Sequence, residues 1–400
     1  MENHSLKRLI RLSDEYEAYT LKNRREIHKN PELSFQEFRT AALVCRELDA
    51  LSIPWEKSPV EPGIIAQIDS GRPGKLLMLR ADMDALPIQE ENDLEFRSER
   101  ENVMHACGHD VHTANLLTVA RILNEMKDCF NGRVKLVFQP GEESGGGGRR
   151  MIEQGLLDEK PDACIGLHVF PWTQGKLVIG SGYLTAFSDG CTVKIHGKAA
   201  HSSTPEEGVD AIGIAAAIVT ALNSVAARNI SPMENSTLNV GKIAGGSAPN
   251  IIASECELSI MMRNITPEAR EVMMEKINSI SKGIAEAMGG SCEISFRQGY
   301  PSVYNDPEFT AFVTDMVENH REVLYDGIVE IPEHYLLTGS QARLIAEDFG
   351  FYSRQVPSCF IQVGTGVYAP AHSSRFMVDE NCIKLCTRLM AAAALRFLSM

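Results

Sequence analysis

Short apolar segments alternate with longer amphipathic ones before residue 187, and this alternation leaves few architectures open. GIIAQID, KLLMLRAD, RVKLVFQ and ACIGLH have the length and composition of buried strands. EFRTAALVCRELDAL, TANLLTVARILNEM and the C-terminal CIKLCTRLMAAAALRFL have helical periodicity. Strands that alternate with helices predict an α/β domain, in which a mostly parallel sheet is covered by helices on both faces.

The order of elements changes between residues 187 and 301. SDGCTVKIHG reads as a strand, GVDAIGIAAAIVTALNSVAA as a helix, STLNVGKIAGG and SECELSIMMRN as two strands, residues 266–288 as a helix, and SCEISFRQ as a strand. This βαββαβ order is typical of a ferredoxin-like unit. We therefore expect residues 1–186 and 302–400 to form the main domain, with residues 187–301 inserted into it.

Composition excludes several classes of partner. With 44% hydrophobic and 23% charged residues, the chain has the composition of a globular protein that is long enough for two domains. A net charge of -14 without a basic cluster argues against nucleic acid and anionic membranes as partners. The charged N-terminal sequence does not resemble a signal peptide, and no apolar run could span a bilayer. We expect a cytoplasmic protein whose ten cysteines, which lack CxxC pairs, are reduced.

Acidic residues and histidines follow several of the predicted strands. In α/β sheets, ligands collect at the carboxyl ends of the strands, where loops vary on a rigid support. The stretch MHACGHDVH adds a cysteine and three histidines. The residues at strand ends are Asp82 and Asp84 after KLLMLRA, Glu142 and Glu143 after RVKLVFQP, His168 after ACIGL, and His372 after SCFIQVGTG.

These residue types are ligands of zinc and related divalent ions. The candidate set is too large for one tetrahedral ion with an open position, but it suits two metal ions that share a bridging ligand and activate a water. Glu142, beside a metal-bound Glu143, is then the candidate general base; a solvated loop is the alternative for such a pair. The candidate metal ligands are Cys107, His109, Glu143, His168 and His372.

Eight motifs in order resemble one known family nearly from end to end. They are RADMDALPIQE, MHACGHDVHTA, QPGEES, GLHVFP, GKAAHSSTPEEGVDAI, GGSAPNII, AEDFGFY and YAPAHSSRF. The family is the zinc aminoacylase and carboxypeptidase family, peptidase family M20, in its hippurate hydrolase and auxin-conjugate hydrolase branch. The resemblance implies a catalytic α/β domain with an inserted lid and dimerisation domain.

The resemblance also implies roles for the metal-site residues. Cys107 bridges the two ions, the other four ligands complete the shells, and Glu142 acts as general base and then as general acid. Related branches have a histidine at the position of Asp82, so Asp82 is not counted as a ligand. Asp84 orients the site from behind the ligands.

In the inserted domain, the resemblance implies that His201 stabilises the oxyanion in the partner subunit's active site. Asn250 and Arg263 hold the substrate carboxylate, and a guanidinium suits this role because it binds carboxylates bidentately. From the residues alone, other readings stay open: a turn residue for His201, a loop cap for Asn250 and a surface charge for Arg263.

The predicted reaction is hydrolysis of an N-acyl-amino acid to a carboxylic acid and an amino acid by a homodimer or higher homo-oligomer. Each subunit is expected to hold two divalent ions, zinc or manganese, although the ligands also accept cobalt or nickel. One alternative keeps the chemistry and takes short peptides, as a dipeptidase or carboxypeptidase. The other is a metal-binding protein on a retired hydrolase fold, against which the completeness of the residue set argues.

Several polar residues have ordinary explanations. Ser34 and Glu37 in HKNPELSFQE predict a capping box for the following helix. We expect His28 to support the rim of the pocket, and His105 and His112 to pack in the loop or to hydrogen-bond to the backbone. Glycines 145–148 lack the Lys-Ser/Thr of a phosphate-binding loop.

Overall fold

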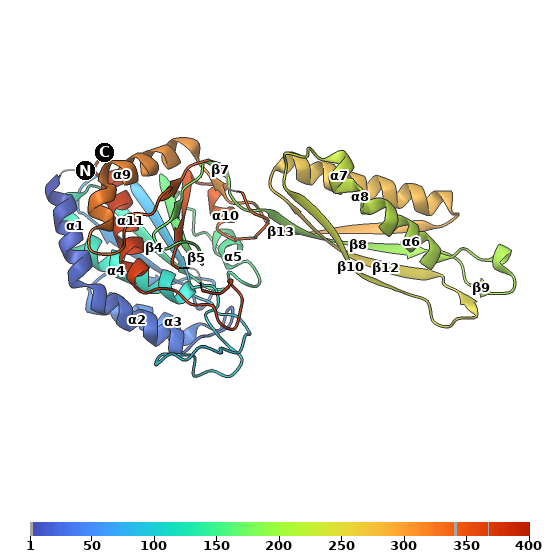
Figure 1. Ribbon diagram of the computed structural model, residues 1–400, viewed down its shortest axis with the longest axis horizontal. Coiled ribbons are helices and arrows are strands. Elements are labelled where there is room, and N and C mark those ends of the chain that lie inside the picture. The colour runs from blue at the N-terminus through green and yellow to red at the C-terminus, as the bar shows by residue number, and fades with distance from the viewer. Residues whose placement is uncertain (1–2, 340–341, 367) are drawn as a thin grey trace. The chain divides into compact units, whose positions relative to one another are not determined.

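A computed structural model describes residues 3–339, 342–366 and 368–400, and the chain forms two compact units, each with its own apolar core (Figure 1). The segments of unit 1 are Met1–Gly182, Val303–Gln341 and Asp348–Met400, and those of unit 2 are Tyr183–Ser302 and Ala342–Glu347. We describe each unit by itself.

Within the described residues, unit 1 is built on an eight-stranded sheet. The four central strands run parallel to one another, and strands of opposite direction flank them on both sides. The carboxyl ends of the central strands therefore meet at one edge. In spatial order the strands are β1 (Trp55–Lys57), β2 (Ile64–Asp69), β4 (Arg133–Gln139), β3 (Leu76–Asp82), β5 (Ala163–Phe170), β16 (Ser358–Gly364), β6 (Leu177–Val178) and β15 (Leu336–Leu337).

Helices cover both faces of this sheet, because the central strands are mainly apolar and β3 and β5 are buried at every residue. Helices α4 and α11 pack on β3 and on each other, whereas α10 lies against β16 and α5 (Figure 1). The helices of unit 1 are α1 (Asn3–Glu15), α2 (Glu17–Lys29), α3 (Phe38–Ala50), α4 (His109–Glu125), the 3-10 turn η1 (Lys127–Cys129), α5 (Gly147–Glu153), α9 (Pro307–Tyr325), α10 (Gly350–Ser353) and α11 (Asn381–Leu398).

Unit 2 has a four-stranded antiparallel sheet in the order β10-β12-β8-β13, with α6 and α8 packed against it. Numbered along the chain, this order is second, third, first, fourth, which is that of a ferredoxin-like fold, so the predicted βαββαβ unit is confirmed. The elements are β8 (Phe187–His196), β9 (Ala200–His201), η2 (Pro205–Glu207), α6 (Ala211–Leu222), α7 (Val225–Asn229), β10 (Ser236–Gly245), β11 (Ile251–Ile252), β12 (Glu255–Asn264), α8 (Pro267–Ala287) and β13 (Ser291–Tyr300).

Two details of unit 2 differ from prediction. The single helix expected for GVDAIGIAAAIVTALNSVAA is two helices, α6 and α7. The Ser224 hydroxyl donates to the Ala221 carbonyl at 2.8 Å, and such local hydrogen bonds compete with a continuous helix. Strands β9 and β11 form a small antiparallel pair that sequence periodicity did not reveal. Two further short strands, β7 (Gly182–Tyr183) and β14 (Tyr304–Asn305), lie where the chain passes between the units.

The start of α3 contradicts the predicted capping box. Glu37 precedes the helix but makes no side-chain cap hydrogen bond. Instead, Glu32 accepts hydrogen bonds from the Arg39 and Thr40 N–H groups at 3.0 and 2.9 Å. The Ser34 hydroxyl donates instead to Asp84 at 2.7 Å, away from the start of the helix. The cap is therefore a glutamate that lies farther from the helix than the pattern implied.

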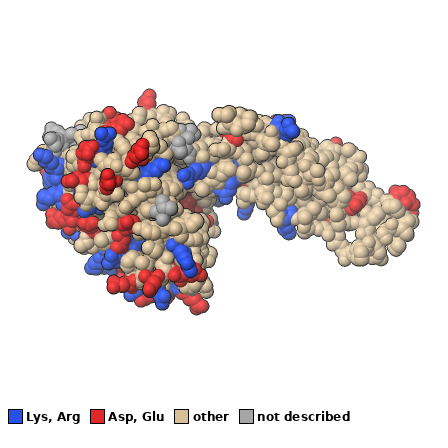
Figure 2. All heavy atoms as spheres, viewed as in Figure 1, with Lys and Arg blue, Asp and Glu red and all other residues tan. Residues whose placement is uncertain are grey.

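The surfaces of the two units differ in charge. On the face shown in Figure 2, acidic and basic side chains are interspersed over unit 1, and charged side chains are sparse over unit 2. Among the described helices, none has both the length and the apolar character needed to cross a membrane.

Candidate metal centre

Five of the predicted ligands converge in unit 1. Cys107, His109 and His168 form one group in which the potential ligand atoms lie within 4.8 Å of one another. A second group of this kind contains Cys107 again, with Glu143 and His372. Cys107 is common to both groups, which is the arrangement that a thiolate bridging two ions requires.

Cys107 and His109 are brought together by the turn that starts α4. Gly108 lies between them with φ 88°, a conformation that favours glycine, and a side chain there would collide with Val169. The Nδ1 atom of His109 lies 3.2 Å from Asp84 Oδ1. Its Nε2 atom is buried and has no hydrogen-bond partner among the described residues, so the lone pair of this nitrogen is available to a metal ion.

His168 comes from the end of β5, as the strand pattern predicted. Its Nδ1 lies 2.7 Å from the Val169 carbonyl oxygen, which orients Nε2 toward Cys107 Sγ at 3.5 Å. The rings of His112 and Phe170 lie 4.5 and 4.6 Å from the His168 ring and hold it in place.

Glu143 and His372 complete the convergence from two loops. The Glu143 N–H donates to Asp84 Oδ2 at 2.9 Å, and Glu143 Oε1 lies 3.3 Å from His372 Nε2. His372 has φ 63°, a strained conformation for a residue other than glycine, and its N–H donates to the Ala106 carbonyl. Strain of this kind persists where the surrounding structure requires the side chain at one place.

Glu142 is buried beside this cluster. It forms a third group with His109 and Glu143, and its Oε1 accepts a hydrogen bond from the Asp348 N–H at 3.2 Å. The Glu142 carboxylate lies next to the candidate ligands and directly precedes Glu143 in the chain. It can therefore exchange protons with a group bound at the cluster.

Charge in the cluster favours a cation. Burial raises the pKa of the Cys107 thiol, and the charge of Glu143 raises it further. Hydrogen bonds with Cys107 and Glu143 raise the pKa of His372 to about 10. Burial alone would lower the pKa of His109, but the charge of Asp82 and the contact with Asp84 raise it. The acidic groups of the cluster thus keep protons on the neighbouring histidines and thiol, and divalent ions would displace these protons. The thiol, imidazole and carboxylate groups, together with the unpartnered His109 Nε2, are suitable ligands for such ions.

Asp82 lies in a further group with His109 and His112, and both of its carboxylate oxygens have other partners. Its Oδ2 accepts from Arg80 at 2.7 Å, and its Oδ1 lies 2.6 Å from His112 Nδ1. His112 Nε2 in turn accepts from the Val169 N–H, the type of backbone bond expected for this histidine. Asp82 therefore holds His112, whose ring packs against His168.

Sequence reasoning missed the buried network beneath the site. The guanidinium of Arg80 donates to Gln139 at 2.9 Å and to Asp348 at 2.6 Å, and Asp348 also accepts from the Gly148 N–H. A signal was present, because Arg80 is a charged residue in an apolar strand. His28 pairs with Asp110 and Glu90 at 2.8 and 3.2 Å, all three being buried.

The three candidates in the inserted region lie in unit 2 and are not gathered in one cluster. His201 is exposed in β9 and contacts the Ser203 hydroxyl at 2.7 Å. The Asn250 carbonyl accepts from the Ser202 N–H, so Asn250 lies close by. Arg263 is in β12, a different strand, and donates to the Leu344 carbonyl at 2.9 Å. Their predicted roles stay predictions.

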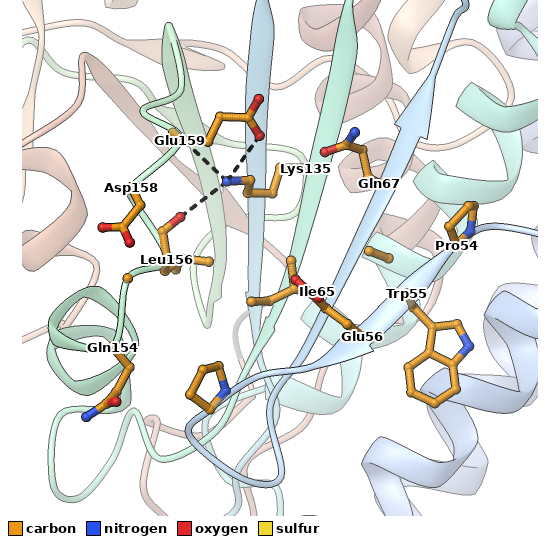
Figure 3. Close-up of a pocket in the computed structure, with 13 residues that line it drawn as sticks. Pro54, Trp55, Glu56, Ile65, Gln67, Lys135, Gln154, Leu156, Asp158 and Glu159 are labelled. Carbon is orange, nitrogen blue, oxygen red and sulfur yellow. Dashed lines mark hydrogen bonds and ion pairs between the residues drawn. The ribbon is translucent and has the colours of Figure 1, made fainter.

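A hollow of about 550 Å³ in unit 1 contains none of the predicted ligands (Figure 3). It is lined in part by Trp55, Ile65 and Gln67. The Lys135 ammonium points to the carbonyl oxygens of Leu156 and Glu159, to which it donates. This lysine already has its partners, which include the Glu159 carboxylate at 3.9 Å.

Comparison with known proteins agrees with the geometry. Residues 78–396 match the model of a family described as Peptidase family M20/M25/M40. The chain is 35% identical over 393 residues to thermostable carboxypeptidase 2 of Saccharolobus solfataricus, covering 96% of each protein. It is 32% identical over 394 residues to the hippurate hydrolase of Campylobacter jejuni, covering 98% of each.

The fold has a solved counterpart. The crystal structure of a dinuclear metal-binding peptidase of the M20 family from Bacillus subtilis is 28% identical and superimposes with a TM-score of 0.84. The match covers 96% of this chain and 99% of that one.

Proposed function

The chain belongs to peptidase family M20/M25/M40, and on this premise we propose that it is a metal-dependent amidohydrolase that cleaves N-acyl-amino acids. The observation that carries the proposal is the convergence of Cys107, shared by two ligand groups, with a buried Glu142 beside it. The products are a carboxylic acid and an amino acid.

Two divalent ions would be held by Cys107, His109, His168, Glu143 and His372. When bound, such ions polarise a carbonyl and lower the pKa of a water. We propose zinc or manganese, because thiolate favours zinc and the imidazole and carboxylate ligands also suit manganese. All ten cysteines are free thiols, which supports a reducing, cytoplasmic setting.

Glu142 acts first as a base and then as an acid. Its carboxylate takes the proton of the attacking water and delivers it to the amine nitrogen as the C–N bond breaks. The Asp348 N–H fixes one carboxylate oxygen, so the group is oriented before substrate arrives. Asp84 orients both His109 and Glu143, because its two oxygens contact the two residues separately.

Unit 2 supplies the remaining groups in this proposal. His201 stabilises the oxyanion in the active site of a second subunit, and Asn250 and Arg263 hold the substrate carboxylate. The exposure of His201 supports a role outside its own unit, since nothing buried constrains its imidazole. The enzyme is accordingly a homodimer or a higher homo-oligomer.

The test is amino-acid release by protein that has been stripped of metal and reloaded with zinc or manganese. The panel contains N-acetyl, N-benzoyl and longer N-acyl amino acids alongside dipeptides, and Glu142→Gln protein controls for contaminating hydrolases. Metal-dependent release from acyl amino acids is expected. Release from dipeptides alone would instead assign the chain to the peptidases, as the carboxypeptidase relative would suggest. Silence with metal bound would indicate a retired site.

A further inference from the structure

The segment between α2 and α3 contacts the loop that carries Glu142 and Glu143. We call residues 140–146, which follow β4, the catalytic loop. The Glu37 carboxylate oxygen Oε1 accepts a hydrogen bond from the Gly141 N–H at 2.8 Å, in a fully buried setting. Gly141 directly precedes Glu142, so this bond fixes the backbone at the base.

Phe35 makes a second contact with the same loop. Gly141 and Gly145 both have positive φ, and a side chain at either would collide with the Phe35 ring. Phe35 itself has φ 63°, and the Arg150 guanidinium stacks over its ring at 4.4 Å. A strained aromatic residue thus fills the space that the two glycines leave open.

Ser34 extends the contact to Glu143. Its hydroxyl donates to Asp84 Oδ2, the oxygen that also accepts the Glu143 N–H. Leu33 forms a bridge with Ala85, which anchors the segment to the end of β3. Three residues within positions 34–37 therefore reach the catalytic loop directly or through one carboxylate.

Capping of α3 does not explain the burial of Glu37. Glu32, not Glu37, caps α3. Glu37 Oε2 has no hydrogen-bond partner among the described residues, and burial together with the charge of Asp84 raises the pKa of Glu37 to about 8. Burial of a carboxyl with an unpaired oxygen costs stability, and the long-range contact that this burial secures is the one with Gly141.

We propose that Glu37 is a positioning residue for the reaction: its carboxyl oxygen holds the Gly141 N–H and thereby sets where Glu142 and Glu143 lie. This inference rests on the proposed function, in which Glu142 is the base and Glu143 a metal ligand. Glu37 acts through the backbone of the loop and touches neither substrate nor metal.

Three variants separate this role from simple packing. Glu37→Gln keeps the shape and an oxygen acceptor, whereas Glu37→Met keeps similar bulk and removes the acceptor. Glu32→Ala is the matched control, because it removes the true cap of α3 and leaves the Gly141 contact intact. Each is assayed for kcat and KM on the best acyl amino acid, with metal content measured on the same sample.

With two ions per subunit bound, we expect Glu37→Met to lose kcat on the order of 10-fold at nearly unchanged KM, since small misplacement of a catalytic group is costly. Glu37→Gln should stay near the wild-type kcat. Glu32→Ala should melt at a lower temperature and keep its kcat. Should the Met variant not fold, Glu37→Asp, which withdraws the acceptor by one methylene, is expected to show the same loss of kcat.

The inference is overturned if removal of the acceptor leaves kcat unchanged, if Gln is as impaired as Met, or if Glu32→Ala loses kcat equally. If the wild type releases nothing from the panel, the proposed function fails and the inference is judged by Co²⁺ absorption instead. Altered bands in Glu37→Met but not in Glu37→Gln would then support positioning of Glu143, and identical bands in all variants would refute it.

Discussion

The candidate residues of unit 1 lie together, whereas those of unit 2 lie apart. In unit 1, residues as far apart in the chain as Cys107 and His372 bring their ligand atoms to one place. In unit 2, His201 and Arg263 are closer in sequence, yet they lie on different strands with different partners. Parallel strands direct their carboxyl ends to one edge, whereas an antiparallel sheet sends its loops to both ends. Unit 1 therefore gathers candidate metal ligands at one place, and the candidate residues of unit 2 form no such cluster among the described residues.

The largest expected effect is at the residue shared by both ligand groups. Cys107→Ala should lose at least one of the two ions and with it the metal-dependent activity, because Cys107 is the residue common to the groups that contain His168 and His372. Metal analysis of the purified variant measures this. Cys45→Ala, a half-buried cysteine on α3, is the control and should keep both ions. Two tightly bound ions in Cys107→Ala would break the claim that unit 1 is organised around this thiol.

Glu142→Gln should have the next largest effect, a loss of kcat. Removal of a general base costs about 10²–10⁴-fold in kcat, while the ligand set is untouched. Steady-state kinetics with metal content on the same sample tests both halves of the expectation. A variant with near-full activity would assign the proton transfer to another residue.

Asp84→Asn should have a smaller effect. Groups that orient metal ligands typically contribute about 10–100-fold to metal affinity, and Asp84 contacts both His109 and Glu143. Competition with a chelator of known affinity measures the change. Unchanged affinity would mean that the loop contacts alone position the ligands.

The smallest expected effect is the activity recovered when two inactive variants are mixed, and it tests the role of unit 2. His201→Ala and Glu142→Gln subunits are mixed after dissociation and reassembled. If each site takes His201 from its partner, heterodimers hold one intact site, and roughly a quarter of wild-type activity should return for random pairing. A mixture as inactive as its parents would show that unit 2 does not complete a second subunit's site.

Sequence predicted the parts of this molecule that depend on periodicity. Apolar runs predict where the strands end, and the structure has His168 near the end of β5 and Glu143 just after β4, as these runs predict. The start of α3 was predicted wrongly, because Ser34 and Glu37 match a capping pattern but are drawn instead to Asp84 and Gly141. Such contacts join segments about 50 and 104 positions apart, and no local pattern encodes them.

The most direct test of the central claim is anomalous diffraction at the metal absorption edge from crystals of the metal-loaded protein. The account predicts two peaks about 3.5–4 Å apart on either side of Cys107 Sγ. One should lie against His109 or His168 and the other against Glu143 or His372. A single peak, or two peaks without Cys107 between them, would contradict it.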